Sequence, residues 1–283
     1  MDRVLLSIGH GYSAQALARV LLPQGWRVIA TTRDPARAAA LTGAGVEGVV
    51  WPEEGLAPHL ARASHVLSSV PPGPAGDPVI AAEGGALRAA RHLAWVGYLS
   101  TTAVYGDHAG GWVDEDTPPA PASARGAARV AAEAAWAGLG LPLHVFRLAG
   151  IYGPGRSPIE RVRAGDARRI VKPGQVFSRI HVDDIAQALA ASMARPGPGA
   201  VWNLCDDEPA PPQDVIAHAA ELLGVPPPPD EPFATAELGP MARSFYGESK
   251  RVRNDRLKRD LGIALRHPNY RAGLAAILAA EAR

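Results

Sequence analysis

The 283-residue chain is poor in cysteine and lysine, and it has no long apolar run. Its single cysteine, Cys205, excludes an internal disulfide and cannot by itself form a thiolate metal site. No apolar stretch approaches the roughly 18 residues that a membrane-spanning helix needs, so we expect no membrane partner. A net charge of +1 gives no electrostatic reason to expect a nucleic acid. We therefore predict a cytoplasmic protein that acts on a small molecule. Its oligomeric state cannot be derived from the sequence.

Short apolar runs alternate with alanine-rich stretches through the first half of the chain. The predicted strands are Val4–Ile8, Arg27–Thr31, Val46–Val50, His65–Val70, Ala94–Ser100 and Leu143–Leu148. The predicted helices are Ser13–Pro23, Pro35–Leu41, Asp77–His92 and Ser123–Leu139. Strands that alternate with helices of this length indicate βαβ units and a parallel sheet, and right-handed crossovers then place helices on both faces. The pattern predicts an α/β fold with a Rossmann-type, doubly wound parallel sheet.

A glycine motif directly follows the first predicted strand and directly precedes a helix. The motif is Gly9-His10-Gly11-Tyr12-Ser13-Ala14, which matches G-x-G-x-x-G/A. The first glycine permits a tight turn, the second lets the backbone approach a pyrophosphate, and the small Ala14 lets helix and strand pack closely. The pyrophosphate then meets free N–H groups at the positive end of the helix. Gly9, Gly11, Tyr12, Ser13 and Ala14 are therefore predicted to bind a dinucleotide.

The end of the second strand predicts which dinucleotide binds. Proteins that prefer NAD usually carry an acid about 20 residues after the glycine motif, where it contacts the ribose hydroxyls. Here the strand ends in Thr32-Arg33 without a carboxylate. Arg33 is suited to grip a 2′-phosphate, and the Thr32 hydroxyl can donate to it. Asp34-Pro35 fits the cap and first position of the next helix instead. The sequence favours NADP over NAD.

The segment after the fourth strand, Ser68-Ser69-Val70-Pro71-Pro72, adds two cofactor contacts. Ligands of doubly wound sheets bind beyond the carboxyl ends of the strands. We therefore expect Val70 and Pro71 to border the cofactor, in a loop that the prolines hold rigid.

From Tyr98 onward, several segments in one order resemble the extended short-chain dehydrogenase/reductase superfamily, which includes nucleotide-sugar epimerases and dehydratases. The matching segments are Leu99-Ser100-Thr101-Thr102-Ala103-Val104-Tyr105-Gly106, Arg147–Arg156 with its Tyr-Gly-Pro-Gly-Arg end, Ile180-His181-Val182-Asp183-Asp184, Trp202-Asn203-Leu204 and Tyr270-Arg271-Ala272-Gly273-Leu274. The likeness covers nearly the whole chain, so it identifies an atypical member of this NAD-dependent epimerase/dehydratase-like superfamily.

The resemblance implies two lobes with the active site between them. Residues 1–153, to which the chain returns at about 176–205, would form the Rossmann domain. Residues 154–175 and 206–283 would form a smaller C-terminal substrate lobe. The resemblance also places Thr101 at the position of the family's catalytic Ser/Thr, which orients the reacting carbonyl or hydroxyl, and Ile151 beside the cofactor.

His181-Val182-Asp183-Asp184 also invites interpretation as a metal site. A histidine with adjacent carboxylates does not have ligand spacing that converges on one ion, so we predict a helix cap there and no metal site in the protein.

The chain departs from the family at its catalytic pair, a tyrosine and a lysine four residues apart on one helix. In this register Arg125 takes the tyrosine position and Arg129 the lysine position. Only three of the 29 basic residues are lysines, so compositional drift alone can explain Arg129, which still carries a charge for the nicotinamide ribose. Arg125 is different, because a guanidinium does not give up its proton and cannot act as a general acid–base.

Three functions are compatible with this departure. In the first, Thr101 and the arginines Arg125 and Arg129 polarise a carbonyl for hydride transfer without proton exchange. Tyr98, Tyr105 and Tyr152 are candidate replacement acids for this enzyme. In the second, the protein is a catalytically silent NADP(H)-binding sensor or scaffold. In the third, it is an epimerase-like enzyme that binds a nucleotide sugar. Arg156 and Arg251 are candidate contacts to the diphosphate of such a ligand.

Overall fold

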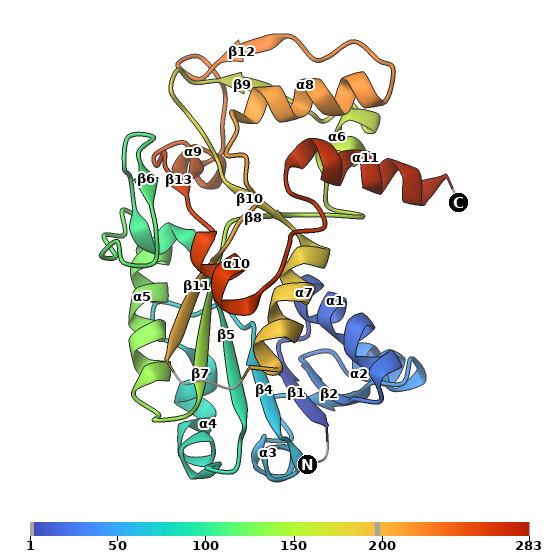
Figure 1. Cartoon of the computed structure of the whole chain (residues 1–283), viewed down its shortest axis with the longest axis vertical. Helices are drawn as coiled ribbons and strands as arrows, with labels where there is room; N and C mark the ends of the chain where they lie inside the picture. Colours follow the sequence, from blue (N-terminus) through green and yellow to red (C-terminus); the bar gives the residue numbers. More distant parts are fainter. Residues whose placement is uncertain (1–2, 196–198, 283) are drawn as a thin grey trace.

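A parallel sheet of seven strands forms the centre of the protein (Figure 1). The computed structural model describes residues 3–195 and 199–282. The order of the strands is β11-β7-β5-β4-β1-β2-β3, and every neighbouring pair is parallel. The strands are β1 (Val4–Ile8), β2 (Arg27–Thr32), β3 (Glu47–Val50), β4 (His65–Ser68), β5 (Trp95–Thr101), β7 (Leu143–Leu148) and β11 (Ala200–Leu204).

Helices cover both faces of this sheet, because successive strand residues point to opposite sides. The flanking helices are α1 (Tyr12–Leu21), α2 (Pro35–Gly43), α3 (Ala57–Arg62), α4 (Pro78–Ala89), α5 (Ala124–Ala137) and α7 (Val182–Met193). Leu5 of β1 belongs to a buried cluster with Leu17 of α1 and Leu189 of α7. The adjacent Leu6 belongs to a second cluster with Leu87 of α4 and Trp136 of α5. The sheet is therefore doubly wound, as the sequence predicts.

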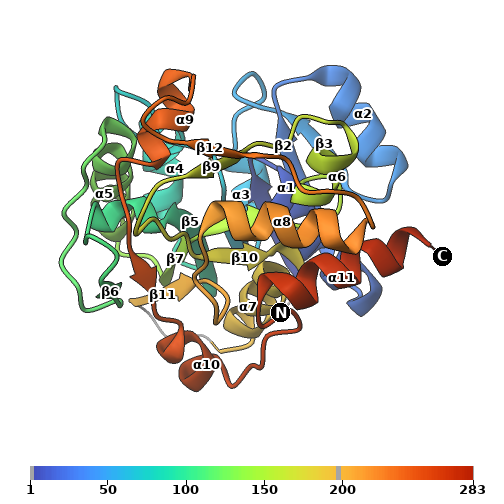
Figure 2. The same ribbon diagram turned by 90° about the horizontal axis from the view of Figure 1, so that it is seen from above.

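The remaining elements lie mainly above the carboxyl ends of the strands (Figures 1 and 2). The short strands are β6 (Trp112–Val113), β8 (Gly150–Tyr152), β9 (Arg169–Val171), β10 (Arg179–His181), β12 (Asp230–Pro232) and β13 (Arg251–Val252). They form the pairs β10-β8, β12-β9 and β13-β6. The remaining helices are α6 (Pro158–Arg163), α8 (Pro212–Leu222), α9 (Pro240–Phe245), α10 (Asp255–Leu261) and α11 (Tyr270–Glu281), together with the 3₁₀ turns η1 (Leu22–Gln24) and η2 (Thr102–Tyr105).

A separate buried cluster holds the upper elements together. Ile159 of α6, Val215 and Ala219 of α8 and Leu274 and Ile277 of α11 form its centre. In Figure 2 α8 crosses the middle of the view, with α11 beside it. Within the described residues, no helix is both long and apolar enough to span a bilayer.

The predicted strands and helices of the first half are confirmed to within a few residues at each end. The largest difference between the strands is at the fourth, predicted at His65–Val70, which ends at Ser68. Ser69 leaves the strand because its hydroxyl donates hydrogen bonds to the carbonyls of Ile8 and Gly9, which turns the chain over the glycine motif.

Candidate functional site

The glycine motif lies at the point where the strand order reverses, between β1 and β4. Gly9 has φ of +77°, a left-handed conformation that favours glycine. Its N–H donates to Thr31 Oγ1 at 2.9 Å. A Cβ at Gly9 would lie 2.7 Å from Val70 Cγ2. Gly9 and Val70 thus pack closely against each other. Both were predicted to contact the cofactor, but neither lines the adjacent cleft.

Gly11 differs from Gly9 because nothing in the protein crowds it. A Cβ there would meet no heavy atom closer than the Gly9 carbonyl oxygen at 3.9 Å. Gly11 caps α1 without a side-chain hydrogen bond, so the first N–H groups of the helix remain available to an anion. Gly11, Tyr12, Ser13 and Ala14 all line the cleft. This arrangement fits the pyrophosphate of a dinucleotide. The pyrophosphate would occupy the open space beside Gly11, which any larger side chain at this position would fill.

The residues predicted to choose between NAD and NADP lie at the end of β2, outside the lining of the cleft. Arg33 is exposed, and the Thr32 hydroxyl accepts a hydrogen bond from the N–H of Asp34 at 3.2 Å. Asp34 caps α2, as predicted. Arg37, which the sequence analysis missed, donates to the His10 carbonyl oxygen at 2.8 Å. Two arginines therefore flank this side of the glycine turn.

A cleft of about 1040 Å³ runs from the first turn of α1 across the ends of β4, β5 and β7 to α9. The lining includes all three predicted catalytic residues, Thr101, Arg125 and Arg129. Of the other predicted cofactor contacts, Pro71 and Ile151 line it as well. The fold therefore brings residues from widely separated segments to one cavity.

Thr101 ends β5 with its hydroxyl at the cleft. Its Oγ1 accepts a hydrogen bond from the N–H of Ala103 at 3.2 Å and caps η2. Among the described residues, no protein acceptor takes the hydroxyl hydrogen of Thr101. The side chain is thereby oriented and can still donate to a ligand oxygen.

The two arginines of α5 have different partners. Arg129 donates to the Leu99 carbonyl at 2.6 Å and to the Tyr98 hydroxyl at 3.0 Å, so it is fixed at the end of β5. Arg125 reaches across the cleft to α9. There its Nη2 donates to Ser244 Oγ at 2.9 Å, and its guanidinium carbon lies 5.0 Å from the centroid of the Phe245 ring.

The three tyrosines considered as replacement acids have unequal access to the cleft. Tyr98 and Tyr105 are fully buried, and neither is among the lining residues. The Tyr105 hydroxyl donates to Asn203 Oδ1 at 2.7 Å, and burial raises the pKa of Tyr98 to about 12. Tyr152 does line the cleft, but burial raises the pKa of its phenol as well. Tyr246, at the end of α9, is a further lining tyrosine that the sequence analysis missed.

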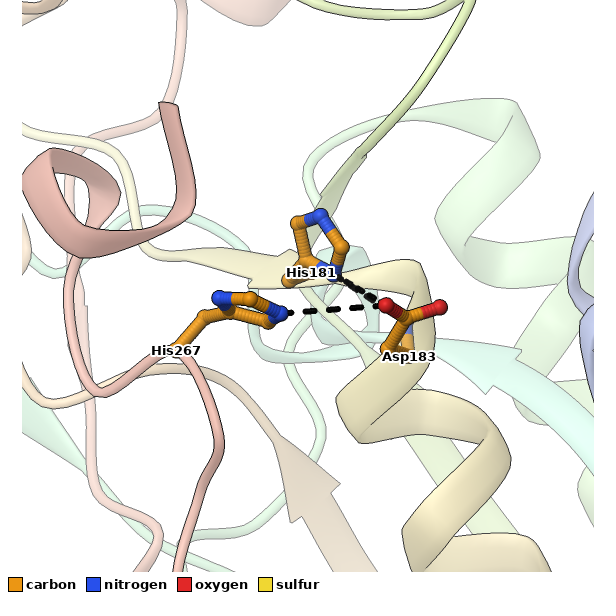
Figure 3. A group of neighbouring side chains, drawn as sticks. All are labelled: His181, Asp183 and His267. Atoms are coloured by element: carbon orange, nitrogen blue, oxygen red, sulfur yellow. Dashed lines mark hydrogen bonds and ion pairs between the residues drawn. The ribbon is translucent and has the colours of Figure 1, made fainter. Parts of the chain in front are cut away.

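His181, Asp183 and His267 meet at the start of α7 (Figure 3). His181 caps the helix by accepting a hydrogen bond from the Asp183 N–H at 3.2 Å, as predicted. Sequence reasoning missed His267, whose Nε2 lies 3.8 Å from the Asp183 carboxylate. The backbone N–H groups of Arg266 and His267 donate to the Asp184 carboxylate, which holds this loop in place.

The role of His181 as a helix cap makes His181, Asp183 and His267 less suitable as ligands of a metal ion. The lone pair on His181 Nδ1 is already engaged by a backbone N–H. Burial, followed by the effect of His267, lowers the pKa of His181 to about 4. Both observations suit a neutral cap that ties α7 to the segment before α11.

Several cationic side chains line the cleft that the sequence analysis did not assign to it, among them Arg161, Arg179 and Lys250. Of the two arginines suggested for a diphosphate, Arg156 lines the cleft, with its guanidinium carbon 5.9 Å from the Tyr12 ring centroid. Arg251 does not line it, and its Nη1 donates to the Gly110 carbonyl.

Comparisons with known proteins relate part of the chain to a family. Residues 85–205 match the model of the NAD dependent epimerase/dehydratase family. A 3-diazoavenalumate denitrifying reductase from Streptomyces is 33% identical over 174 residues, which are 58% of this chain and 55% of the reductase. The match thus spans about half the length of that relative.

Solved structures extend the likeness to the whole chain. A functionally unknown conserved protein from Silicibacter pomeroyi is 60% identical, with both chains fully covered and a TM-score of 0.94. The human epimerase family protein SDR39U1, solved with NADPH, is 20% identical, with coverage of 97% of this chain and 98% of its own and a TM-score of 0.76. Residues 85–205 thus match the NAD dependent epimerase/dehydratase family, and the whole chain has the same fold as the human epimerase family protein.

Proposed function

We propose that the protein is an NADP(H)-dependent oxidoreductase that acts on a carbonyl or hydroxyl group of a small molecule. The observation that carries the proposal is the single cleft that joins the uncapped start of α1 to Thr101 and Arg129. The reductase name of the Streptomyces relative supports a reduction. The Rossmann part, residues 1–153 and 176–205, would hold the cofactor, and the C-terminal lobe would hold the substrate.

The residues present suit a phosphorylated dinucleotide. The N–H groups of α1 and the nearby Arg156 would hold the pyrophosphate, and Arg33 with Arg37 would hold a 2′-phosphate. The human relative was solved with NADPH, whereas the matching family is described as NAD dependent, so the preference for NADP rests on these arginines.

When bound, a reduced nicotinamide supplies a hydride. Thr101 would orient the substrate oxygen by donating its free hydroxyl hydrogen. Arg129, fixed by Leu99 and Tyr98, would present a constant positive charge near that oxygen. A fixed positive charge stabilises an oxyanion without transferring a proton. In this proposal, water or a cleft residue other than Arg125 supplies the proton afterwards.

A silent NADP(H) sensor remains the second candidate, because no tyrosine occupies the family position at Arg125. Turnover separates the two functions. We would titrate purified protein with NADPH and then follow its oxidation against carbonyl compounds and nucleotide sugars, with Gly11→Val as the cofactor-free control. Oxidation above that control supports the enzyme. Tight NADPH binding with no oxidation and no isotope exchange at the nicotinamide supports the sensor.

A further inference from the structure

Tyrosine and phenylalanine side chains gather in the cleft, whereas none of the six tryptophans lines it. The sequence holds six tyrosines and four phenylalanines, and six of these ten residues line the cavity. They are Tyr12, Tyr152, Phe177, Phe245, Tyr246 and Tyr270. Tyr12 lies beside the glycine turn, and its hydroxyl donates to the Pro154 carbonyl at 2.9 Å. Of the other five, Tyr152 and Phe177 belong to the Rossmann part, whereas Phe245, Tyr246 and Tyr270 belong to the C-terminal lobe. We call these five residues the aromatic wall.

The aromatic wall offers ring surfaces to a ligand. Phe177 and Tyr246 meet edge to face, with ring centroids 5.6 Å apart. Phe245 is 55% exposed, so part of its ring is accessible to a ligand. Aromatic side chains prefer to stack on, or meet edge-on, another π-system. The wall therefore suits a planar, unsaturated ligand better than a hydroxyl-rich sugar.

A positive charge without a carboxylate partner lies among these rings. Arg179 lines the same cavity as Tyr152, Tyr246 and Tyr270. Its Nη1 donates to the carbonyls of Phe177 and Ala210, which fix the guanidinium. Among the described residues no carboxylate lies within 4.0 Å of it, and its Nε and Nη2 have no hydrogen-bond partner there.

The carboxyl group that interacts most strongly with Arg179 is that of Asp206, and the two form no ion pair within 4.0 Å. Burial raises the pKa of Asp206 to about 8. Arg125, over the ring of Phe245, likewise has no carboxylate partner among the described residues. Both arginines line the cleft, where an anion can pair with them.

The volume of the cleft limits the size of the anion that can bind there. Single small-molecule sites usually measure about 300–1,000 Å³. The whole cleft of about 1040 Å³ must also hold the dinucleotide of the proposed function, which leaves room for a small substrate.

We infer that the substrate is a small aromatic or conjugated carboxylate, whose carboxylate pairs with Arg179 while its ring lies against Phe177, Tyr246 and Phe245. A guanidinium fork matches a carboxylate in geometry and charge, and this gives the site its specificity. The inference rests on the proposed oxidoreductase function, because it assigns the substrate of that same cleft.

Binding of model acids tests the inference independently of turnover. Cinnamate, methyl cinnamate, 3-cyclohexylpropanoate and UDP-glucose would be titrated by calorimetry into the wild-type protein, with and without saturating NADP⁺. We expect cinnamate to bind at least about 10-fold more tightly than the ester and the saturated acid, a difference of about 1.4 kcal/mol. Equal affinities for cinnamate and its ester, or tighter binding of UDP-glucose, would overturn the inference.

Substitutions of Arg179 test whether this residue binds the carboxylate. Arg179→Gln should weaken cinnamate binding at least about 10-fold and leave the affinity for the ester unchanged, whereas Arg179→Lys should restore part of the loss. Arg88→Gln, on the exposed face of α4, is the matched control and should bind like the wild type. If Arg179→Gln does not fold, the ligand series on the wild type still decides. NADPH binding without cinnamate binding would refute this inference alone, and cinnamate binding without NADPH binding would refute the proposed function alone.

Discussion

Arg129 donates a hydrogen bond to the hydroxyl of Tyr98 at 3.0 Å, and its guanidinium carbon lies 5.6 Å from the centroid of the same ring. The chain thus has a tyrosine beside a cation, although the family pattern is lost at position 125. This tyrosine is fully buried and stacks on Trp136. The pair therefore anchors Arg129, and it cannot exchange protons with a ligand in the cleft.

The arginine at the end of β2 predicts the cofactor preference. Arg33→Ala should weaken NADPH binding and leave NADH binding unchanged, because a charge-assisted pair with the 2′-phosphate contributes on the order of 1.5–3 kcal/mol. Titration of both cofactors into both proteins measures this, with Arg88→Ala as the surface control. Equal affinity of the wild type for NADH and NADPH would contradict the assignment.

Gly9 and Gly11 should respond differently to substitution. Gly11→Val should fold and lose cofactor binding, because the added side chain enters free space where the pyrophosphate is expected. Gly9→Val should instead destabilise the protein, because Gly9 has a positive φ and contacts Val70 closely. Thermal unfolding and NADPH titration of the two variants separate these effects. A folded Gly11→Val protein that still binds NADPH would disprove the phosphate site.

Activity should depend on the Thr101 hydroxyl. If the protein is an oxidoreductase, Thr101→Val should lower kcat/KM by about 10²–10³-fold, the usual cost of removing one preorganised donor. Thr101→Ser should keep most of the activity, because it retains both the hydroxyl and the cap on η2. Equal loss in the Ser and Val variants would indicate a packing role.

Position 125 should affect turnover without changing its pH dependence. Arg125→Ala should weaken turnover through lost charge and leave the shape of the pH–rate profile unchanged, because no proton transfer is removed. The double change Arg125→Tyr with Arg129→Lys rebuilds the family pair. It should add slow carbonyl reduction that has a titration in the tyrosine range. A titration that disappears in Arg125→Ala would refute this account of the mechanism.

His10 should make the protein less stable in mild acid. Burial, together with the nearby Arg37, lowers the pKa of His10 to about 4, so the folded protein keeps this ring neutral at a pH where the unfolded chain binds a proton. Stability contributed by the neutral ring is therefore complete above about pH 6.5 and falls as the pH drops towards 4. Between pH 7 and pH 5 this loss is on the order of 2 kcal/mol.

Urea unfolding of the cofactor-free protein at both pH values measures this effect. His10→Gln should lose less stability than the wild type over that interval by a similar amount. Identical losses would show that other groups carry the acid sensitivity.

Much of the fold and part of the site could be predicted from residues that are close together in the sequence. The glycine motif and the cap at Asp34 depend on neighbouring residues, so pattern alone located them. Phe245 and Tyr246 lie about 120 residues from Arg125, and only the folded chain brings them to it. His267 is a similar case, because it reaches Asp183 through a loop that Asp184 holds. Long-range contacts of this kind leave no periodic signal in one sequence.

The position of β1 in the middle of the sheet has a consequence for synthesis. A nascent chain emerges N-terminus first, and the glycine turn is complete once β4 pairs with β1 and Ser69 reaches Gly9. The aromatic wall forms later, because Tyr246 and Tyr270 are synthesised after every strand of the central sheet. A nascent chain therefore presents the glycine turn before the aromatic wall exists. Stabilisation by a ligand that contacts both becomes available only after Tyr270 has been synthesised.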